Sequence, residues 1–249
     1  MLLLIILRTE EEEMSHVWLC IPSAAPAPRL NEALARWQQL GYYTAIFRDI
    51  ESRPLLHDGV WTNVVDADIT HYGKYEGYAA AVNKLCHAVT KQHPEAEWFV
   101  AGGDDIQPDP SHHAHDIAKE CNSYFGGTFG IMEPTGDRWL EDAEGKCSAE
   151  RVCIAPWMGR EWVDHGYAGK GPYPEGYYHF FADEELKLVA ERLGMLWQRP
   201  DLTQYHDNWQ REGGRQRPAY LEKAAKARDR DLALFLERKA AGFPGSGPQ

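Results

Sequence analysis

Two adjacent carboxylates, Asp104 and Asp105, follow a short apolar run and two glycines. The run Trp98–Ala101 is typical of a buried strand, and glycine lets the chain turn sharply after it. Adjacent carboxylates repel each other unless a cation lies between them, and Mg²⁺ or Mn²⁺ with a phosphate-bearing ligand suits such a pair. An Asp-rich polar turn has the same composition, so a purely structural alternative stays open.

Two later positions could act with this pair. Asp183 opens the run Asp183-Glu184-Glu185-Leu186 at the expected start of a helix, directly after Phe180-Phe181-Ala182. Apolar surroundings raise a carboxyl pKa and make the group a better general base, whereas capping of the helix is the structural alternative. His206 stands between Tyr205 and Asp207 in a polar and aromatic segment, which favours a metal-ligand role over that of an ordinary surface or core histidine.

Strands and helices alternate through the first half of the chain. The expected strands are His16–Ile21, Tyr43–Phe47, Val60–Val65 and Trp98–Ala101, and the expected helices are Arg29–Leu40 and Ala79–Val89. This β-α-β-α-β order predicts an α/β fold with a mostly parallel sheet flanked by helices. The polar residues that follow the strands should then meet at one edge of the sheet, where α/β proteins bind ligands.

The second half is less regular. Helices are expected at His112–Tyr124, Ala182–Leu193 and Pro218–Ala241, and strands at Tyr124–Ile131, Ser148–Trp157 and Met195–Gln198. Between them lies the loop Gly166–Tyr178, which is rich in glycine, proline and tyrosine. A loop of this length without a regular period is often functional.

Composition limits the function classes. The 249 residues carry a net charge of −12, which argues against a generic nucleic-acid binder but allows a local basic patch. The five cysteines show no CxxC spacing and are expected to be free thiols in a reducing, cytoplasmic compartment.

The apolar stretch Met1–Leu7 is too short to span a bilayer and lacks the features of a signal peptide. We expect residues 1–13 to be an extension before a natural start at Met14, residues 14–210 to form the main domain, and residues 211–249 to form a basic helix and polar tail.

The order of these pieces resembles the GT-A-fold, nucleotide-sugar-dependent glycosyltransferases of the inverting, family-2-like kind. The resemblance runs from Val17 to Trp209. Gly103-Asp104-Asp105 stands where that family has its DxD metal motif, with glycine in place of the first Asp. Asp183-Glu184-Glu185-Leu186 resembles the family's ED-x-E-L element, with Ala182 in place of the first acid. Gly73–Asn83 and Met158-Gly159-Arg160 resemble two further family segments.

The resemblance implies roles for these residues. Asp183 would be the catalytic base, and Asp105 with His206 would bind Mn²⁺ or Mg²⁺. A UDP-sugar donor would contact Pro22, Ser23, Arg48, Asp66, Tyr72, Gly73, Lys74, Asn83 and Asp104. A glycoside hydrolase that uses Asp104 and Asp183 is one alternative, and a non-catalytic module that binds a sugar or nucleotide is another.

The acceptor side is expected to include Trp157, Arg160, Tyr178 and His179. Among such enzymes the chain most resembles those of bacteriophages that decorate hydroxymethylated pyrimidines in DNA, which would place it in the host cytoplasm, away from membranes. From Arg211 to Lys239 nine basic residues outnumber five acidic ones, and basic side chains give proteins most of their DNA affinity. A solvated amphipathic helix has the same pattern, and a polysaccharide or small metabolite would then be the acceptor.

Overall fold

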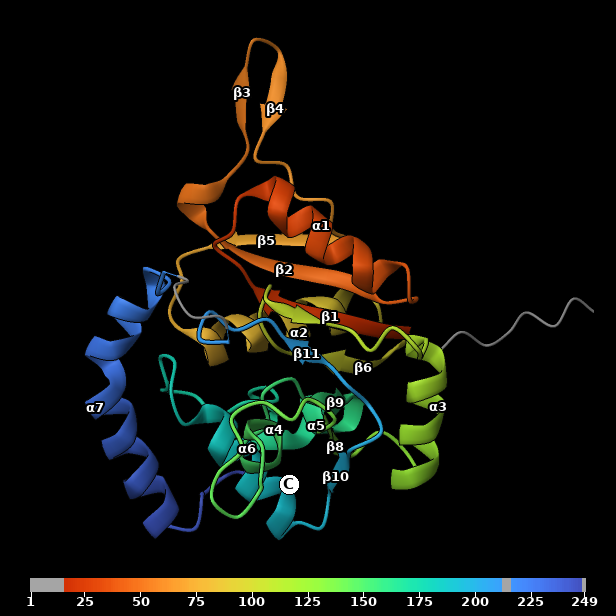
Figure 1. Ribbon diagram of the computed structural model, residues 1–249, viewed down its shortest axis with the longest axis vertical. Helices are drawn as coiled ribbons and strands as arrows, with labels where there is room; N and C mark the ends of the chain where they lie inside the picture. The colour runs from red at the N-terminus through yellow and green to blue at the C-terminus, as the bar shows by residue number, and fades with distance from the viewer. Residues whose placement is uncertain (1–15, 212–215, 248–249) are drawn as a thin grey trace, which may run out of the picture.

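The central sheet organises the molecule. The computed structural model describes residues 16–211 and 216–247, so the expected extension at residues 1–13 lies outside the described residues. Seven strands pair in the order β10-β8-β9-β6-β1-β2-β5 (Figure 1). They span His16–Pro22 (β1), Tyr43–Asp49 (β2), Ile69–Gly73 (β5), Ala96–Val100 (β6), Ile131–Pro134 (β8), Trp157–Gly159 (β9) and Leu196–Arg199 (β10). All pairings are parallel except those of β9, so the expected mixed α/β fold with a mostly parallel sheet is confirmed.

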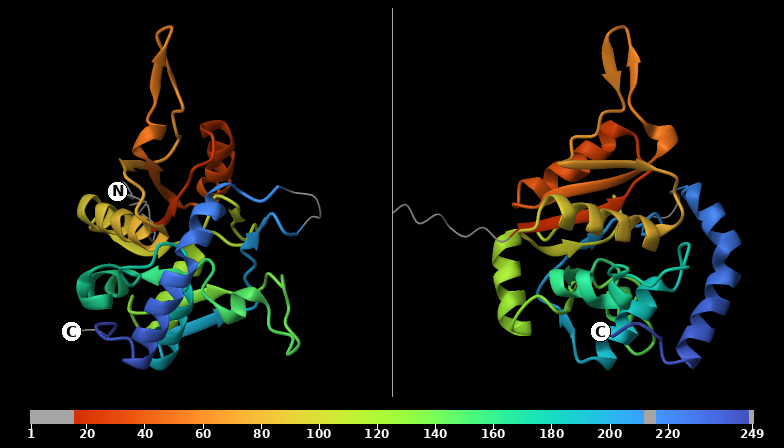
Figure 2. Two further views of the ribbon diagram at one scale, coloured as in Figure 1. Left: turned by 90° about the vertical axis from the view of Figure 1, so that its left-hand side faces the viewer. Right: turned by 180° about the vertical axis from the view of Figure 1, so that it is seen from behind.

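Helices cover both faces of the sheet (Figures 1 and 2). On one face lie α1 (Ala27–Gln38) and α3 (Ala114–Phe125), and on the other lie α2 (Tyr78–Gln92), α5 (Arg160–His165) and α6 (Ala182–Arg192). Successive residues of β1 point to opposite faces, so Leu19 packs under α1 and Cys20 under α2. Because both faces are covered, the central strands are apolar throughout, as the sequence pattern predicts.

The region before β9 differs from the sequence prediction. The strand expected at Ser148–Trp157 is instead a short helix, α4 (Ser148–Arg151), followed by an irregular segment and then β9. The strand expected at Tyr124–Ile131 is also wrong, because α3 continues to Phe125 and β8 begins only at Ile131. Both errors fall where the chain has short elements and no lasting hydrophobic period.

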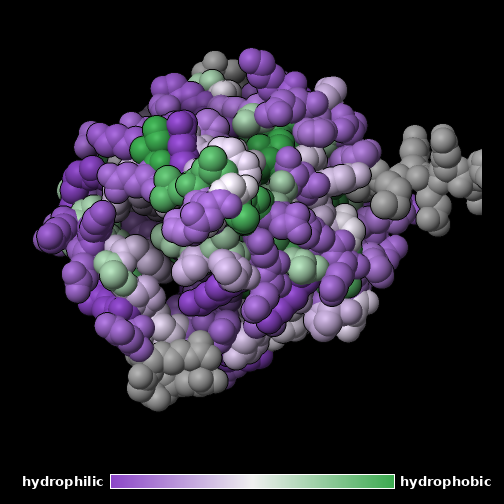
Figure 3. Space-filling view, turned by 90° about the horizontal axis from the view of Figure 1, so that it is seen from above, coloured by the Kyte–Doolittle hydropathy of each residue, from purple (hydrophilic) through white to green (hydrophobic). Residues whose placement is uncertain are grey.

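A hairpin replaces the expected third strand. Val60–Val65 was predicted to join the sheet, but β3 (Leu55–His57) and β4 (Val60–Thr62) pair only with each other and project from one end of the molecule (Figures 1 and 2). The third strand along the chain that joins the sheet is β5, at Ile69–Gly73. The hairpin exposes Leu55, Leu56, Val60 and Trp61, and Figure 3 shows apolar side chains gathered at this end.

The C-terminal helix α7 (Tyr220–Ala240) runs beside α6 (Figure 1). Glu185 of α6 is completely buried and accepts hydrogen bonds from Arg238 of α7 and from the Tyr177 hydroxyl. Two small elements complete the arrangement, β7 (Ile106–Gln107) and β11 (Tyr205–His206), which pair antiparallel. Within residues 16–211 and 216–247, no helix is both long enough and apolar enough to cross a membrane.

Candidate active site

The carboxyl ends of β1 and β6 bring Ser23 and Asp104 together. Ser23 follows β1, its backbone N–H donates to the Phe47 carbonyl of β2, and its hydroxyl donates to the Asp104 carboxylate. Burial raises the pKa of Asp104, the Ser23 hydrogen bond partly offsets that rise, and the neighbouring Asp105 adds to it. The two carboxylates therefore stand at the ligand edge of the sheet.

Asp105 meets His206 although the two are far apart in the sequence. The β7–β11 pairing sets His206 opposite Ile106, and the Asp207 N–H donates to the Asp105 carbonyl at 2.7 Å. As a result the His206 Nε2 atom lies 3.3 Å from the Asp105 Oδ2 atom. The β7–β11 pairing brings the two side chains together. Motifs that are considered one at a time do not reveal this pairing.

The Asp105–His206 pair fits a divalent ion as part of a ligand set. A carboxylate oxygen and an imidazole nitrogen are ligands that Mn²⁺ accepts, and Mg²⁺ takes carboxylates together with substrate phosphates. Among the described residues no group of three or more His, Cys, Asp or Glu side chains is arranged to hold a metal. The pair can therefore supply two ligands, and a bound ion would need the rest from a phosphate ligand and water.

A folded loop after β8 holds His206 from the other side. Asp137 accepts the His206 backbone N–H at 2.9 Å and also pairs with Arg211. The Trp139 ring meets the His206 ring edge-on at 5.4 Å, and the Arg211 guanidinium stacks over Trp139 and Tyr205. The position of His206 therefore depends on a loop for which the sequence analysis assigned no role.

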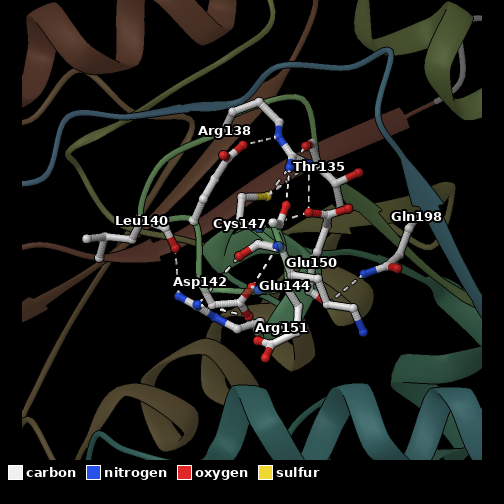
Figure 4. Close-up of polar contacts among 12 residues, drawn as sticks. Thr135, Arg138, Leu140, Asp142, Glu144, Cys147, Glu150, Arg151 and Gln198 are labelled. Atoms are coloured by element: carbon white, nitrogen blue, oxygen red, sulfur yellow. Dashed lines mark hydrogen bonds and ion pairs between the residues drawn. The ribbon is translucent and has the colours of Figure 1, made fainter.

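Arg138 fixes the shape of this loop (Figure 4). Its guanidinium pairs with Glu141 at 2.8 Å and Glu150 at 2.6 Å and also donates to the Gly145 carbonyl. Glu150 in turn accepts the Cys147 backbone N–H at 2.8 Å. These contacts close the loop on itself, so Asp137 and Trp139 project from a defined support.

Asp183 lies near the start of α6, at the same end of the sheet. The residue at the helix N-cap is Phe181, in the left-handed conformation, so Asp183 is not the N-cap itself, although its carboxylate still interacts with N–H groups of the first turn as the capping alternative supposes. Burial raises the pKa of Asp183 to about 6, partly offset by the N–H groups of Asp183 and Glu184. Burial and the Asp183 charge together raise the pKa of Glu184 to about 7. Asp183 is therefore largely ionised near neutral pH, with a basicity above that of an ordinary aspartate.

The loop that leads into α6 is held by Asp231 of α7. The Asp231 carboxylate is completely buried and accepts the backbone N–H groups of Tyr178, His179 and Phe180 at 2.9 to 3.2 Å. Burial alone would raise the pKa of Asp231, but these N–H groups and Arg230 lower it below the ordinary value. One carboxylate thus fixes the backbone that presents both His179 and Asp183.

Aromatic side chains gather around Tyr220, which lies near the acidic pair. Tyr75 meets Tyr178 edge-on at 5.8 Å, and His179 meets Tyr220, the first residue of α7, at 5.9 Å. Tyr220 is 50% exposed, and its partial burial, followed by the charges of Asp105 and Asp104, raises its pKa to about 12. Tyr220 therefore lies within electrostatic reach of both carboxylates, a position that its place in the sequence does not indicate.

The expected donor residues fall into two groups. The ends of β1, β2 and β5 bring Pro22, Ser23, Arg48, Tyr72, Gly73 and Lys74 to the edge that also holds Asp104. Arg48 is buried, donates to the Ala25 carbonyl, and keeps a buried Nε atom without a partner among the described residues.

Asp66 and Asn83 are not with this group. Asp66 precedes β5 and its backbone bonds to Asn31 and Gln38 of α1, because the strand expected to end there is not in the sheet. The Asn83 amide is used to hold the Tyr173 backbone, accepting its N–H and donating to its carbonyl at 3.0 Å each. Neither placement supports a donor contact.

Two expected acceptor residues are also elsewhere. Trp157 has no exposed surface and packs in the core against Tyr42. Because β9 runs antiparallel, the residue after it, Arg160, emerges at the opposite edge and bonds to Asp164 and to the Pro94 carbonyl. Neither placement supports an acceptor contact, whereas Tyr178 and His179 lie on the backbone segment that Asp231 holds before α6, next to Tyr75 and Tyr220.

No protein-family model matches the chain, and no curated protein matches it. Solved structures do match, among them a glycosyltransferase involved in the glycosylation of the major capsid of PBCV-1. That match has 9% sequence identity and a TM-score of 0.31, and it covers 60% of this chain and 62% of the other. The chain thus spans less than two thirds of that structure, and a likeness this distant carries no argument about function.

Proposed function

We propose that the chain is a glycosyltransferase that moves a sugar from a UDP-sugar to a hydroxyl group by inverting, metal-assisted chemistry. The observation that carries the proposal is the meeting of Asp105 and His206 at 3.3 Å beside the Asp104–Ser23 pair. The site lies at the carboxyl edge of a mostly parallel sheet, where α/β proteins bind nucleotides. The resemblance of the acidic motifs to family-2-like enzymes points the same way.

The donor would bind across the ends of β1, β2 and β5. The buried Arg48 guanidinium, with its unpartnered Nε atom, and the exposed Lys74 offer positive charge for phosphate. Asp105 and His206 would hold a Mn²⁺ or Mg²⁺ ion, and such an ion when bound stabilises the departing nucleotide diphosphate as a Lewis acid. Asp104, oriented by Ser23, would support the ion or bind the ribose.

Asp183 would be the general base. Its carboxylate, with a pKa raised to about 6 by burial, would accept the proton of the acceptor hydroxyl as the new glycosidic bond forms. An inverting transfer needs one such base and no covalent sugar intermediate. The aromatic border of Tyr75, Tyr178 and Tyr220 offers ring faces on which a sugar or base could stack.

We propose that the acceptor is the hydroxymethyl group of a modified pyrimidine in DNA. Exposed basic residues on α7, among them Lys223 and Lys226, favour it. The positive charge free for DNA is smaller than the sequence implies, because Arg211, Arg230 and Arg238 form ion pairs with Asp137, Asp231 and Glu185. Arg215 lies outside the described residues.

The decisive experiment measures donor binding and turnover separately. Binding of UDP and UDP-sugars is followed by calorimetry with and without Mn²⁺, and turnover by release of UDP. We expect Asp105→Ala to abolish the Mn²⁺ dependence of binding, and Asp183→Asn to retain binding while turnover falls by about 10² to 10⁴-fold. Asp164→Asn, at the opposite edge, is the matched control. Unchanged metal dependence in Asp105→Ala would show that the proposed site is wrong.

The acceptor is tested with radiolabelled donor and three substrates: DNA that contains 5-hydroxymethylcytosine or 5-hydroxymethyluracil, unmodified DNA, and an oligosaccharide. Label on the hydroxymethylated DNA alone is the expected result. Label on the oligosaccharide alone would reject the DNA acceptor and keep the transferase.

A further inference from the structure

A second pocket lies beyond His206, away from the Ser23–Asp104 pair. It is lined by the end of β8, the start of α4, the Asp137–Trp139 loop and the chain around β11. Glu133, Gln204 and His206 contribute polar side chains to the lining, and Trp139 contributes an aromatic one. The interior free for a water-sized group is about 10 Å³, roughly the space of one water or one hydroxyl.

Several polar atoms in this lining are buried without a hydrogen-bond partner in the described part of the chain. They are the Glu133 Oε2 atom, both amide atoms of Gln204, and the His206 Nδ1 atom. Glu133 and Gln204 are 1% and 7% exposed, so bulk water does not satisfy them. Such atoms are rare in folded proteins, and several in one pocket indicate a missing polar partner, either a water or a hydroxyl group of a ligand.

The residue types narrow the chemistry of that ligand. Carboxylate and amide oxygens accept hydrogen bonds, and the Gln204 amide nitrogen donates them, so the ligand must both donate and accept. Hydroxyl groups do both. The lining includes the carboxyl groups of Glu133 and Asp137 but no lysine or arginine. Burial raises the pKa of Glu133 well above its usual range, and Asp137 is paired with Arg211, so the lining offers an anionic group no free positive partner. An uncharged polyhydroxylated molecule with an apolar face for Trp139 would fit.

The pocket also has a suitable position for the proposed reaction. His206 forms one side of it, and Glu133 forms another; burial and, to a smaller extent, the nearby Asp183 charge raise the pKa of Glu133. In a transfer from a metal-bound diphosphate to a hydroxyl activated by Asp183, the moving sugar must lie between the ion and the base.

We propose that this pocket binds the sugar of the donor through its hydroxyl groups and selects an uncharged sugar over one that carries a carboxylate. The ring would rest at the mouth, with a single hydroxyl group inside the pocket against Gln204 and Glu133. This inference rests on the proposed function, because it assigns the sugar end of the same donor.

The test compares the affinities of UDP, UDP-glucose, UDP-galactose and UDP-glucuronic acid with Mn²⁺ present. For the wild-type protein we expect at least one neutral UDP-sugar to bind about tenfold more tightly than UDP, and UDP-glucuronic acid to bind no better than UDP. Gln204→Ala should remove most of the neutral-sugar advantage and leave UDP affinity unchanged. Glu133→Gln, which keeps an oxygen for the Ile154 and Ala155 N–H groups, should reduce it as well.

Gln198→Ala is the matched control, because Gln198 bonds to the Glu150 carbonyl and does not line the pocket. If neither UDP nor any donor binds the wild-type protein, the proposed function and this inference both fail. Three results would overturn only this inference and mean that the pocket holds water. The first is that UDP binds but no UDP-sugar binds more tightly than UDP, and the second is that UDP-glucuronic acid binds best. The third is that Gln204→Ala and Glu133→Gln keep the full preference for the neutral sugar.

Discussion

The two sides of the candidate site are built differently. On the side of β1, β2 and β5, functional side chains follow strands whose positions are set by apolar residues buried on both faces of the sheet. On the side of α6 and β11, they lie at the ends of short elements whose adjoining backbone is held by single carboxylates, namely the buried Asp231 under residues 178–180 and the partly buried Asp137 at His206. The first side is therefore held in place by many apolar contacts, whereas the second depends on one carboxylate at each point.

This difference predicts how each side responds to substitution. Loss of one polar contact at the strand ends leaves the strands in place, because their burial and pairing are unaffected. Loss of a carboxylate that accepts several backbone N–H groups leaves those groups buried and unsatisfied, at a cost of about 1–3 kcal/mol each.

The largest effect is expected for Asp231→Ala. Three backbone N–H groups would lose their acceptor, so we expect the free energy of unfolding to fall by about 3–5 kcal/mol, with loss of turnover because the loop before Asp183 is no longer fixed. Urea denaturation measures the first effect, and UDP release measures the second. Asp229→Ala, an exposed position on the same helix, is the control and should change stability by less than about 0.5 kcal/mol. Equal urea midpoints for Asp231→Ala and Asp229→Ala would show that the loop before Asp183 does not depend on the Asp231 carboxylate.

An intermediate effect is expected from pH. Asp183 accepts a proton only when ionised, and its pKa is raised to about 6, so kcat/KM should rise about tenfold per pH unit below that value and level off above it. The profile is measured at fixed Mn²⁺ with a neutral donor. Glu184→Gln should leave the midpoint near 6, because Glu184, with a pKa raised to about 7, is still protonated where Asp183 ionises. A wild-type midpoint near 7 that disappears in Glu184→Gln would instead make Glu184 the base.

The smallest effect is expected for Ser23→Ala. The variant removes one hydrogen bond to Asp104, whereas the Ser23 backbone stays bonded to the Phe47 carbonyl. We expect a loss of about 1 kcal/mol in stability and a modest loss of donor affinity. A destabilisation as large as that of Asp231→Ala would mean that the strand ends depend on single contacts just as the loops do.

The sequence predicts the first side of the site better than the second. The apolar runs of β1, β2 and β6 and the acids after β6 are local patterns, so the sheet and the place of Asp104 and Asp105 could be read from them. The hairpin at β3–β4 was mistaken for a sheet strand because Val60–Val65 has the same apolar pattern, and only the tertiary pairing places it outside the sheet. Trp157 and Arg160 were misplaced because the direction of β9 is not encoded in so short a strand.

The second side depends on contacts between distant segments. Asp137, Gln204, Tyr220 and Asp231 are ordinary polar or aromatic residues in sequence, and their roles follow from loops that meet through the β7–β11 pairing and the packing of α7 on α6. Asp183 and His206 could be singled out by type and surroundings. Their supporting residues had no comparable local signal.

The Asp231 carboxylate also bears on how the protein is made. The backbone N–H groups that it accepts belong to residues synthesised about fifty positions earlier, so a growing chain carries the 178–180 segment before its acceptor exists. The strands β1, β2, β5 and β6 are all complete by then and can pair with one another. A nascent chain would therefore acquire the sheet edge that holds Ser23 and Asp104 well before the loop that presents Asp183 is fixed, and the side that carries Asp183 would be the last to mature.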